Sequence, residues 1–231
     1  MNATFAQSIL FRSVSSLLVS LGILLMSVTM VQAKDKDAPD TPDALVSEIF
    51  EKVNQELKEN EAKIREDKFF LKTLAESLLS PYVSFETMSK QILGKNWRKI
   101  TPDQRVRYTE AFKNRVSLTM VNQYDPNREY DFKVTGARTN QQGDRAAVAT
   151  EVVDKSNGTK YNISYKMFVD RQTKNWQVYD VAVEGVSVLQ SFKTASAEDF
   201  KRNGIEYMIA QLEDGIAKEK EATKPQQSAA N

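Results

Sequence analysis

Two carboxylates with apolar neighbours are the first candidates for chemistry in this sequence. Asp180 follows Tyr179 in a valine-containing run, and Glu151 precedes Val152 and Val153. A carboxylate facing an apolar pocket beside a tyrosine hydroxyl can perform acid/base chemistry on an apolar substrate. For Asp180 we favour the alternative, which is a structural hydrogen bond or exposure to solvent. A strongly raised pKa in a cavity would instead favour an enzyme.

The sequence contains neither histidine nor cysteine. Without histidine there is no Ser-His-Asp or Cys-His catalysis, no ordinary zinc site and no side chain that titrates near pH 6.5 when unperturbed. Without cysteine there are no disulfides, so the core alone must stabilise the fold. Any enzyme would therefore have to work with carboxylates, lysines or tyrosines, which makes catalysis less expected. We predict no catalytic residues, no bound metal and no cofactor.

Residues 1–33 have the pattern of a signal peptide. Arg12 is their only charge, Val14 to Met30 is mostly apolar, and the small residues of Val31-Gln32-Ala33 form a cleavage site. We expect cleavage near Ala33 and export. An uncleaved anchor is the alternative, since about 20 apolar residues span a bilayer. A lipoprotein anchor is excluded because no cysteine follows the apolar run.

The rest of the chain is formally neutral and long enough for one domain. Of the 32 basic side chains one lies in the signal peptide, which leaves 31 against 31 acidic ones. Such a balance gives no sequence-wide attraction to nucleic acid or to an anionic membrane. We predict a flexible leader at 34–43, one domain at 44–218 and a disordered tail at 219–231.

Helical periodicity dominates the first half of the domain. The clearest signal is Thr101-Pro102-Asp103-Gln104, in which threonine caps, proline takes the first helical position and glutamine completes a capping box. Asp43 and Ser84 are further candidate caps, and Gly94 can close a helix. The predicted helices cover residues 44–67, 69–79, 85–93, 101–123 and 197–218.

Beyond Arg128 the period changes from helical to two, which indicates strands. The runs are separated by three to five turn residues, and such connections join only neighbouring antiparallel strands. The pattern predicts an α+β domain with helices packed on one face of a curved four-stranded meander. The four strands cover residues 130–139, 145–154, 160–170 and 176–183.

The third strand has one strongly apolar face. Tyr161, Ile163, Tyr165, Met167 and Val169 alternate with mostly polar residues. Such a face is covered either by close-packed helices or by helices that leave an apolar cavity. From the pattern alone the close-packed core is the better prediction.

Two blocks of sequence resemble the MlaC, or toluene-tolerance, family. The first is Leu93-Gly94-Lys95-Asn96-Trp97-Arg98, followed by the threonine-proline helix start. The second is Trp176-Gln177-Val178-Tyr179-Asp180-Val181 with Glu184-Gly185-Val186-Ser187-Val188. The resemblance spans Ala44 to Leu212.

The resemblance implies an NTF2-like fold with an apolar cavity that holds the acyl chains of a phospholipid. It also implies a periplasmic carrier that catalyses no reaction and holds phospholipid as cargo, not as a cofactor. Its partners would be an inner-membrane ABC transporter with a periplasmic ring and an outer-membrane lipoprotein-porin complex, and its role would be to maintain outer-membrane lipid asymmetry. The alternatives are a small NTF2-like enzyme acting on an apolar substrate and a periplasmic adaptor with a solid core. The expected lipid-binding residues are Tyr82, Phe85, Trp97, Met120, Tyr124, Val148, Val152, Ile163, Tyr165, Met167, Val178 and Val181.

Overall fold

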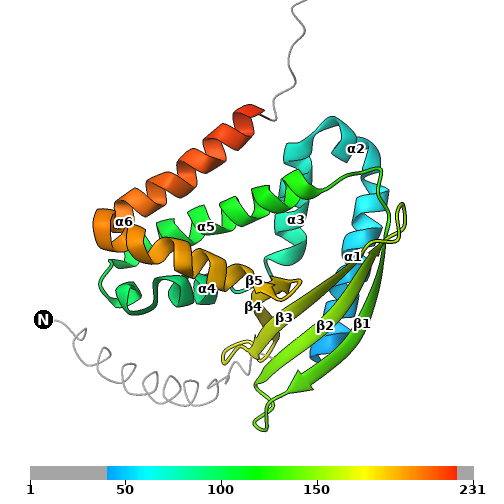
Figure 1. The fold of residues 1–231 in the computed structure, drawn as a ribbon, viewed down its shortest axis with the longest axis horizontal. Coiled ribbons are helices and arrows are strands. Elements are labelled where there is room, and N and C mark those ends of the chain that lie inside the picture. Colours follow the sequence, from blue (N-terminus) through cyan, green and yellow to red (C-terminus); the bar gives the residue numbers. More distant parts are fainter. Residues whose placement is uncertain (1–40, 223–231) are drawn as a thin grey trace, which may run out of the picture. The chain divides into compact units, whose positions relative to one another are not determined.

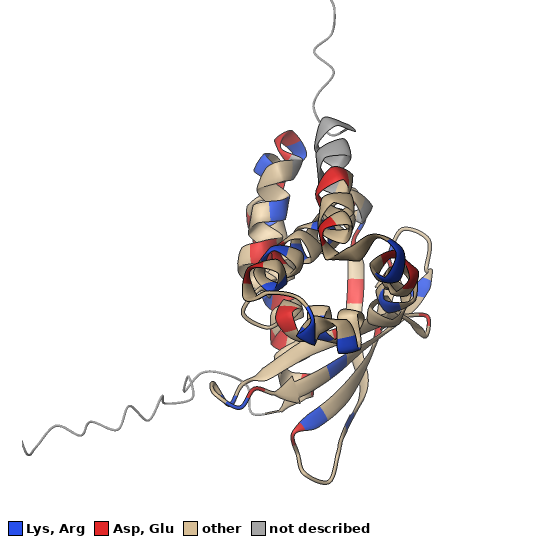
Figure 2. Ribbon diagram, turned by 90° about the vertical axis from the view of Figure 1, so that its left-hand side faces the viewer, with Lys and Arg blue, Asp and Glu red and all other residues tan. Residues whose placement is uncertain are grey.

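The computed structural model describes residues 41–222. The predicted signal peptide, most of the predicted leader and most of the predicted tail lie outside the described residues. Six α-helices and a five-stranded antiparallel sheet make up the described part, which confirms the α+β prediction (Figure 1). A side view shows the helices gathered on one side of the strands (Figure 2). Among the helices at 41–222, none is both long and apolar enough to cross a membrane.

The first predicted helix is two helices, α1 (Pro42–Glu59) and α2 (Glu61–Glu66). The predicted cap Asp43 is wrong. Thr41 caps α1 by accepting from Ala44 N, while Asp43 lies in the first turn. The break falls at Asn60, whose side chain turns back and donates to the Glu56 carbonyl at 2.9 Å. A side chain that bonds its own backbone competes with helix continuation.

Three further helices follow closely the predicted limits. Helix α3 is Lys68–Leu79 and helix α4 is Phe85–Leu93, which Ser84 caps. Gly94 ends α4 with φ 55°, a conformation that glycine adopts without strain, and an unpredicted short 3-10 helix, η1 (Gly94–Arg98), comes next. Helix α5 (Pro102–Gln123) begins with both hydrogen bonds of the predicted capping box at Thr101.

The sheet is a meander in the order β1-β2-β3-β4-β5. Its four long strands agree with the prediction, apart from one residue at the end of β3. The fifth strand was not predicted, because its two residues are too few to show a period. The strands are β1 (Tyr130–Thr139), β2 (Arg145–Asp154), β3 (Lys160–Val169), β4 (Trp176–Val183) and β5 (Val186–Ser187).

A bulge in β4 changes which residues face the helices. Lys166 pairs with Asp180 and the next residue, Met167, pairs with Val178, so Tyr179 is the extra residue. An extra residue reverses the alternation of side chains along a strand. Val178 and Val181, three positions apart, therefore share the face toward the helices, while Asp180 points to the other face.

The last helix begins earlier than predicted. Helix α6 covers Val188–Ala222, and its start is stabilised by Ser187, whose hydroxyl accepts from Gln190 N at 3.0 Å. Gly204 interrupts it with φ 76° and ψ −177°, a combination that is available essentially only to glycine. Thus α6 consists of two helical stretches at an angle. The predicted helix at 197–218 left out residues 188–196 and did not include the break at Gly204.

The buried side chains form separate clusters. One joins α4, η1, α5 and α6 around Tyr108, Phe112 and Ile209. A second joins α1 to the sheet around Leu45, Val148, Met167, Val178 and other residues. A small third cluster lies where α2, α3 and the end of α5 meet. The space between the first two clusters is the site described next.

Candidate functional site

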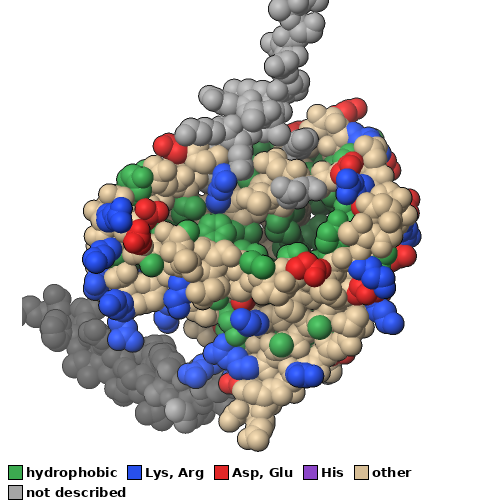
Figure 3. Space-filling model, in the orientation of Figure 1, with side chains coloured by type: hydrophobic (Ala, Val, Ile, Leu, Met, Phe, Trp, Pro, Cys, Tyr) green, Lys and Arg blue, Asp and Glu red, His purple; other side chains and the backbone are tan. Residues whose placement is uncertain are grey.

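An apolar cavity of about 460 Å³ lies between the sheet and helices α1, α3, α4 and α5. Its lining carries one charged side chain, Glu76, and two serines, Ser80 and Ser117. The space-filling view shows apolar side chains gathered in the hollow between these elements (Figure 3). The lining residues are Val46, Ile49, Phe50, Val53, Ala75, Glu76, Leu79, Ser80, Tyr82, Val83, Phe85, Met88, Val116, Ser117, Met120, Phe132, Ile163, Tyr165, Val178, Val181, Val183 and Val188.

The sheet contributes the floor of the cavity. Ile163 and Tyr165 belong to the apolar face of β3 that the alternation predicted. On β4 the bulge at Tyr179 brings Val181 and Val183 to the same side as Val178. Without that extra residue, Asp180 would face the cavity, and a buried carboxylate there would disfavour an apolar ligand.

Helix α1 contributes a wall that the sequence assigned only to packing. Val46, Ile49, Phe50 and Val53 occupy positions i, i+3, i+4 and i+7, so they form one stripe along the helix. The Phe50 ring stacks on Phe132 of β1, with centroids 3.8 Å apart and an interplanar angle of 17°. The apolar spacing of α1 was visible in the sequence. This spacing does not show whether the stripe contacts other side chains or borders a cavity.

The cavity is open at one side. Met120 and Val183 line it, yet their side chains are 51% and 41% exposed. Large apolar side chains that are half exposed at the edge of an apolar cavity mark its mouth, because a closed core would cover them. A hydrophobic ligand can therefore enter without unfolding of the surrounding helices.

The one carboxylate in the lining is already paired. Lys72, a buried residue, donates to Glu76 Oε1 at 2.6 Å and to Asn114 Oδ1 at 2.8 Å. This network joins α3 to α5 behind the lining. Removing either charge would leave the other uncompensated in a partly buried position, so the pair is a structural feature of the wall.

Tyr165 places a hydroxyl on the floor, and its polar atom is satisfied. Burial raises the pKa of Tyr165, and a weaker opposing effect comes from its hydrogen bond with Thr150. The hydroxyl therefore stays neutral well above neutral pH. Thr150 in turn donates to the Ile163 carbonyl at 3.1 Å, so this part of the floor has no unpaired polar group.

Seven of the twelve residues expected to bind lipid line the cavity, and they come from α4 and the turn before it, α5, β3 and β4. They are Tyr82, Phe85, Met120, Ile163, Tyr165, Val178 and Val181. Their contact with lipid stays a prediction.

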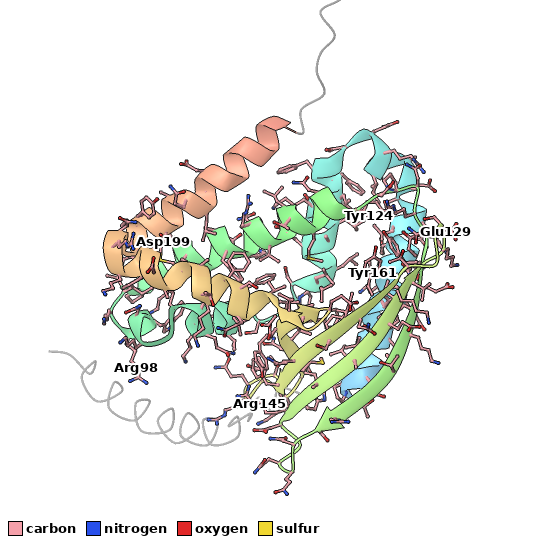
Figure 4. All side chains as sticks on the ribbon, in the orientation of Figure 1. Arg98, Tyr124, Glu129, Arg145, Tyr161 and Asp199 are labelled. Carbon is pink, nitrogen blue, oxygen red and sulfur yellow. The ribbon has the colours of Figure 1, made fainter. Side chains whose placement is uncertain are left out.

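The other five lie elsewhere. Val148 and Met167 are fully buried in the filled cluster between α1 and the sheet. Trp97 is buried in the helical cluster with the Arg105 guanidinium over its ring. Tyr124 packs against the third cluster, at the end of the sheet that also holds Tyr161 (Figure 4). Val152 pairs with Phe132 and Tyr161 in the sheet but is not part of the lining.

Neither candidate catalytic carboxylate faces the cavity. Asp180 is buried and accepts from Lys166 Nζ at 3.0 Å, from Leu189 N at 3.1 Å and from the Ser187 hydroxyl. It holds the start of α6 against β4, as the structural interpretation of this residue predicted. Glu151 forms an ion pair with Lys160 at 3.2 Å. Within residues 41–222 no group of carboxylates is arranged to hold a metal ion.

The fold and the cavity together define the class as an α+β protein with an open apolar cavity. The MlaC family profile, described as "MlaC protein", matches residues 47–214, and this chain belongs to that family. The match covers all of the cavity lining except Val46. It confirms the resemblance that the glycine-lysine and glycine-valine-serine blocks indicated.

Individual relatives are distant. The chain is 18% identical over 180 residues to the intermembrane phospholipid transport system binding protein MlaC of Haemophilus influenzae, covering 78% of this chain and 84% of that protein. It is 26% identical over 168 residues to toluene tolerance protein ttg2D of Pseudomonas putida, covering 72% and 76%.

A solved structure shares the fold. The phospholipid-binding protein from Ralstonia solanacearum, determined in complex with a phospholipid, superposes with a TM-score of 0.70 at 19% identity. The superposition covers 77% of this chain and 98% of that one. At this identity the likeness establishes the common fold.

Proposed function

We propose that this chain is a phospholipid carrier of the periplasm whose open apolar cavity holds acyl chains. The cavity is the observation that carries the proposal, and membership in the MlaC family supports it. The Haemophilus and Ralstonia proteins, named for phospholipid transport and phospholipid binding, are consistent with it. The predicted signal peptide at residues 1–33, cleaved near Ala33, would deliver the chain to that compartment.

The size of the cavity fits an acyl chain. Groups of the size of water or methylene occupy about 30 Å³ each, so 460 Å³ holds roughly fifteen of them. Each buried methylene contributes about 0.8 kcal/mol, which gives about 12 kcal/mol before the costs of binding are subtracted. A favourable contribution of this size needs no charged contact, and the one charge in the lining is neutralised by Lys72.

The headgroup would remain at the mouth. Among the described residues that line the cavity, no lysine or arginine could hold a phosphate inside. A phosphate transferred into such surroundings without a partner would lose its hydration at a large cost. The acyl region would contact the seven predicted residues in the lining, together with α1 residues such as Phe50 and Val53.

The proposed partners are an inner-membrane ABC transporter with a periplasmic ring and an outer-membrane lipoprotein-porin complex. Between them the carrier would shuttle phospholipid and so maintain outer-membrane lipid asymmetry. It would need no catalytic residue, and the hydrogen bonds that occupy Asp180 are consistent with that. Transfer of a fluorescent phospholipid from the loaded carrier to each reconstituted complex tests these partners one at a time.

Native mass spectrometry of the mature protein, purified from the periplasm without detergent, tests the proposed cargo. We expect an adduct with the mass of a phospholipid, lost on solvent extraction and identified in the extract. A chain that is purified without ligand and takes up no lipid from vesicles would contradict the carrier. In that case a substrate screen against apolar esters and a search for bound protein would separate an enzyme from an adaptor.

A further inference from the structure

A cluster of exposed cations lies in α4, in η1 and in the turn that follows. Four cations are exposed there, namely Lys90 of α4, Lys95 and Arg98 of η1, and Lys99 in the turn after η1. Glu86 is the only acidic residue from Phe85 to Lys99. Among residues 41–222 none of these four cations forms a salt bridge, whereas Arg65 of α2, Lys72 of α3 and Arg107 of α5 each do.

The cluster continues onto the sheet. Arg145 begins β2, and its guanidinium lies 5.5 Å and 5.6 Å from the ring centroids of Phe168 and Tyr179. Arg171 and Lys174 are exposed in the turn between β3 and β4. Helix α4 starts beside this turn, because Val83 bridges to Val178, two residues after β4 begins. Figure 4 places Arg98 and Arg145 on the same side of the protein, and Figure 2 looks onto that side.

We call these residues the basic face: Lys90, Lys95, Arg98, Lys99, Arg145, Arg171 and Lys174. Its seven cations are accompanied by Glu86, Asp144 and Asp170. The two aspartates are occupied within their turns, Asp144 by Asn140 and Asp170 by Gln172 N and Thr173 N. By contrast, residues 41–80, which form α1 to α3, hold nine carboxylates against six cations. The neutral chain is therefore polarised.

The basic face is built on rigid supports. Trp97, which is buried, anchors η1 between the neighbouring cations and lies under Arg105. Arg145 is fixed over two aromatic rings. The backbone that carries these charges is therefore held in place, while the ends of the lysine side chains remain free to move. Such a surface suits a layer of mobile anions better than a single rigid anionic group.

We propose that the basic face docks the carrier on a bilayer that contains anionic phospholipid. Clusters of several lysines and arginines bind such surfaces by additive electrostatic attraction, without a specific pocket. The acidic helices α1 to α3 would be repelled, so the same polarity would orient the bound protein. This inference does not depend on what the cavity holds.

Co-sedimentation of the mature protein with vesicles tests the proposal. One set contains phosphatidylglycerol and phosphatidylcholine, and the other contains phosphatidylcholine alone. We expect binding only to the first set, and loss of binding near 1 M salt, where the screening length falls to about 3 Å. Binding that is equally strong without the anionic lipid, or that persists at 1 M salt, would overturn the proposal.

Two matched double variants locate the binding surface. K95Q/K99Q removes two charges from the basic face, and K52Q/K58Q removes two exposed charges from α1. At about fivefold per lysine, K95Q/K99Q should weaken vesicle binding about 20- to 30-fold, and K52Q/K58Q less than about twofold. Equal losses in the two variants would contradict a docking face here. If K95Q/K99Q fails to fold, K90Q/R171Q replaces it.

Other occupants are outcomes of the same test. If the basic face instead binds a second copy through α1 to α3, wild-type protein will dimerise at low salt and K95Q/K99Q will not, with no binding to vesicles. Capture of an acidic periplasmic protein without vesicle binding would likewise overturn the proposal. Native mass spectrometry of K95Q/K99Q keeps the two proposals separate, because its lipid adduct depends only on the cavity.

Discussion

Helix α5 borders a filled region and a hollow one, and the same stripe of the helix faces both. Tyr108, Phe112, Val116 and Met120 follow one another at intervals of four, so they lie along one face. Tyr108 and Phe112 are 1% and 0% exposed. Val116 and Met120 line the cavity.

The two halves of this stripe differ in the elements that cover them. The first half of α5 is covered by α4 and α6, and Phe112 meets Phe85 and Phe192 edge to face at centroid distances of 6.3 and 5.0 Å. The second half faces α1, α3 and the sheet across a void. Similar apolar residues thus build a core where partners reach them and a binding site where they do not. The predictions below test this contrast, from the largest expected effect to the smallest.

Phe112→Ala should damage the filled region most. It removes a fully buried ring with two aromatic partners, and such truncations cost about 3–5 kcal/mol. Urea denaturation measures the loss of unfolding free energy. A cost below about 1 kcal/mol would show that this region is as loosely packed as the cavity.

Tyr108 predicts alkaline sensitivity of the same region. Burial raises its pKa to about 12, with a smaller opposing effect from a hydrogen bond to Ser196. The stability that the neutral Tyr108 hydroxyl contributes is therefore complete below pH 10, and it is lost as the pH rises from 10 to 12. At 1.4 kcal/mol for each pH unit this amounts to about 3 kcal/mol.

Unfolding free energy measured across pH 9 to 12 should fall less steeply in Tyr108→Phe than in wild type. Some slope should remain, because burial also raises the pKa of Tyr165. Identical profiles for wild type and Tyr108→Phe would exclude this residue as a source of the pH dependence.

A matched pair of substitutions compares the two regions on one sheet. Val148→Phe adds volume where the side chain is fully buried among filled neighbours, and should cost about 1–3 kcal/mol by overpacking. Val181→Phe points the same ring into the cavity, where space is available, and should cost less than about 1 kcal/mol.

Lipid content separates this pair further. Val181→Phe should retain less phospholipid in native mass spectra, because the added ring takes part of the volume of about 460 Å³. The folded fraction of Val148→Phe should keep its adduct. The reverse pattern would place the ligand in another part of the molecule.

Met120→Ala should have the smallest effect on stability. Its side chain is 51% exposed at the mouth, and substitutions at such positions usually change stability by about 0.5 kcal/mol or less. Faster release of a fluorescent phospholipid would indicate that Met120 shields the bound chain. A loss as large as that of Phe112→Ala would refute the open mouth.

Features that depend on neighbouring residues were predictable. The capping box at Thr101, the end of α4 at Gly94 and the limits of the four long strands follow from local propensities and turns. The break at Asn60 and the start of α6 were missed. The start of α6 depends on Asp180, a residue of β4 that accepts from Leu189 N, nine positions later in the chain and in a different element.

The lining was only partly predictable for a similar reason. Alternation along β3 identified Ile163 and Tyr165, but also Met167, which lies against packed neighbours. On β4 the large apolar residues change phase between Val178 and Val181. The bulge at Tyr179 turns that change into one shared face, so that Val181 faces the cavity and Asp180 does not.

The sequence by itself determined the α+β order of elements, the absence of histidine and cysteine chemistry, and the motifs of the MlaC family. These depend on residue type and short spacing, which the chain carries without folding. Only the tertiary structure decided where apolar faces meet and where they remain apart, and it gathered the cations of the basic face on one side. Burial and net surface charge arise from contacts between distant segments, and no local pattern records whether an apolar stripe will be covered.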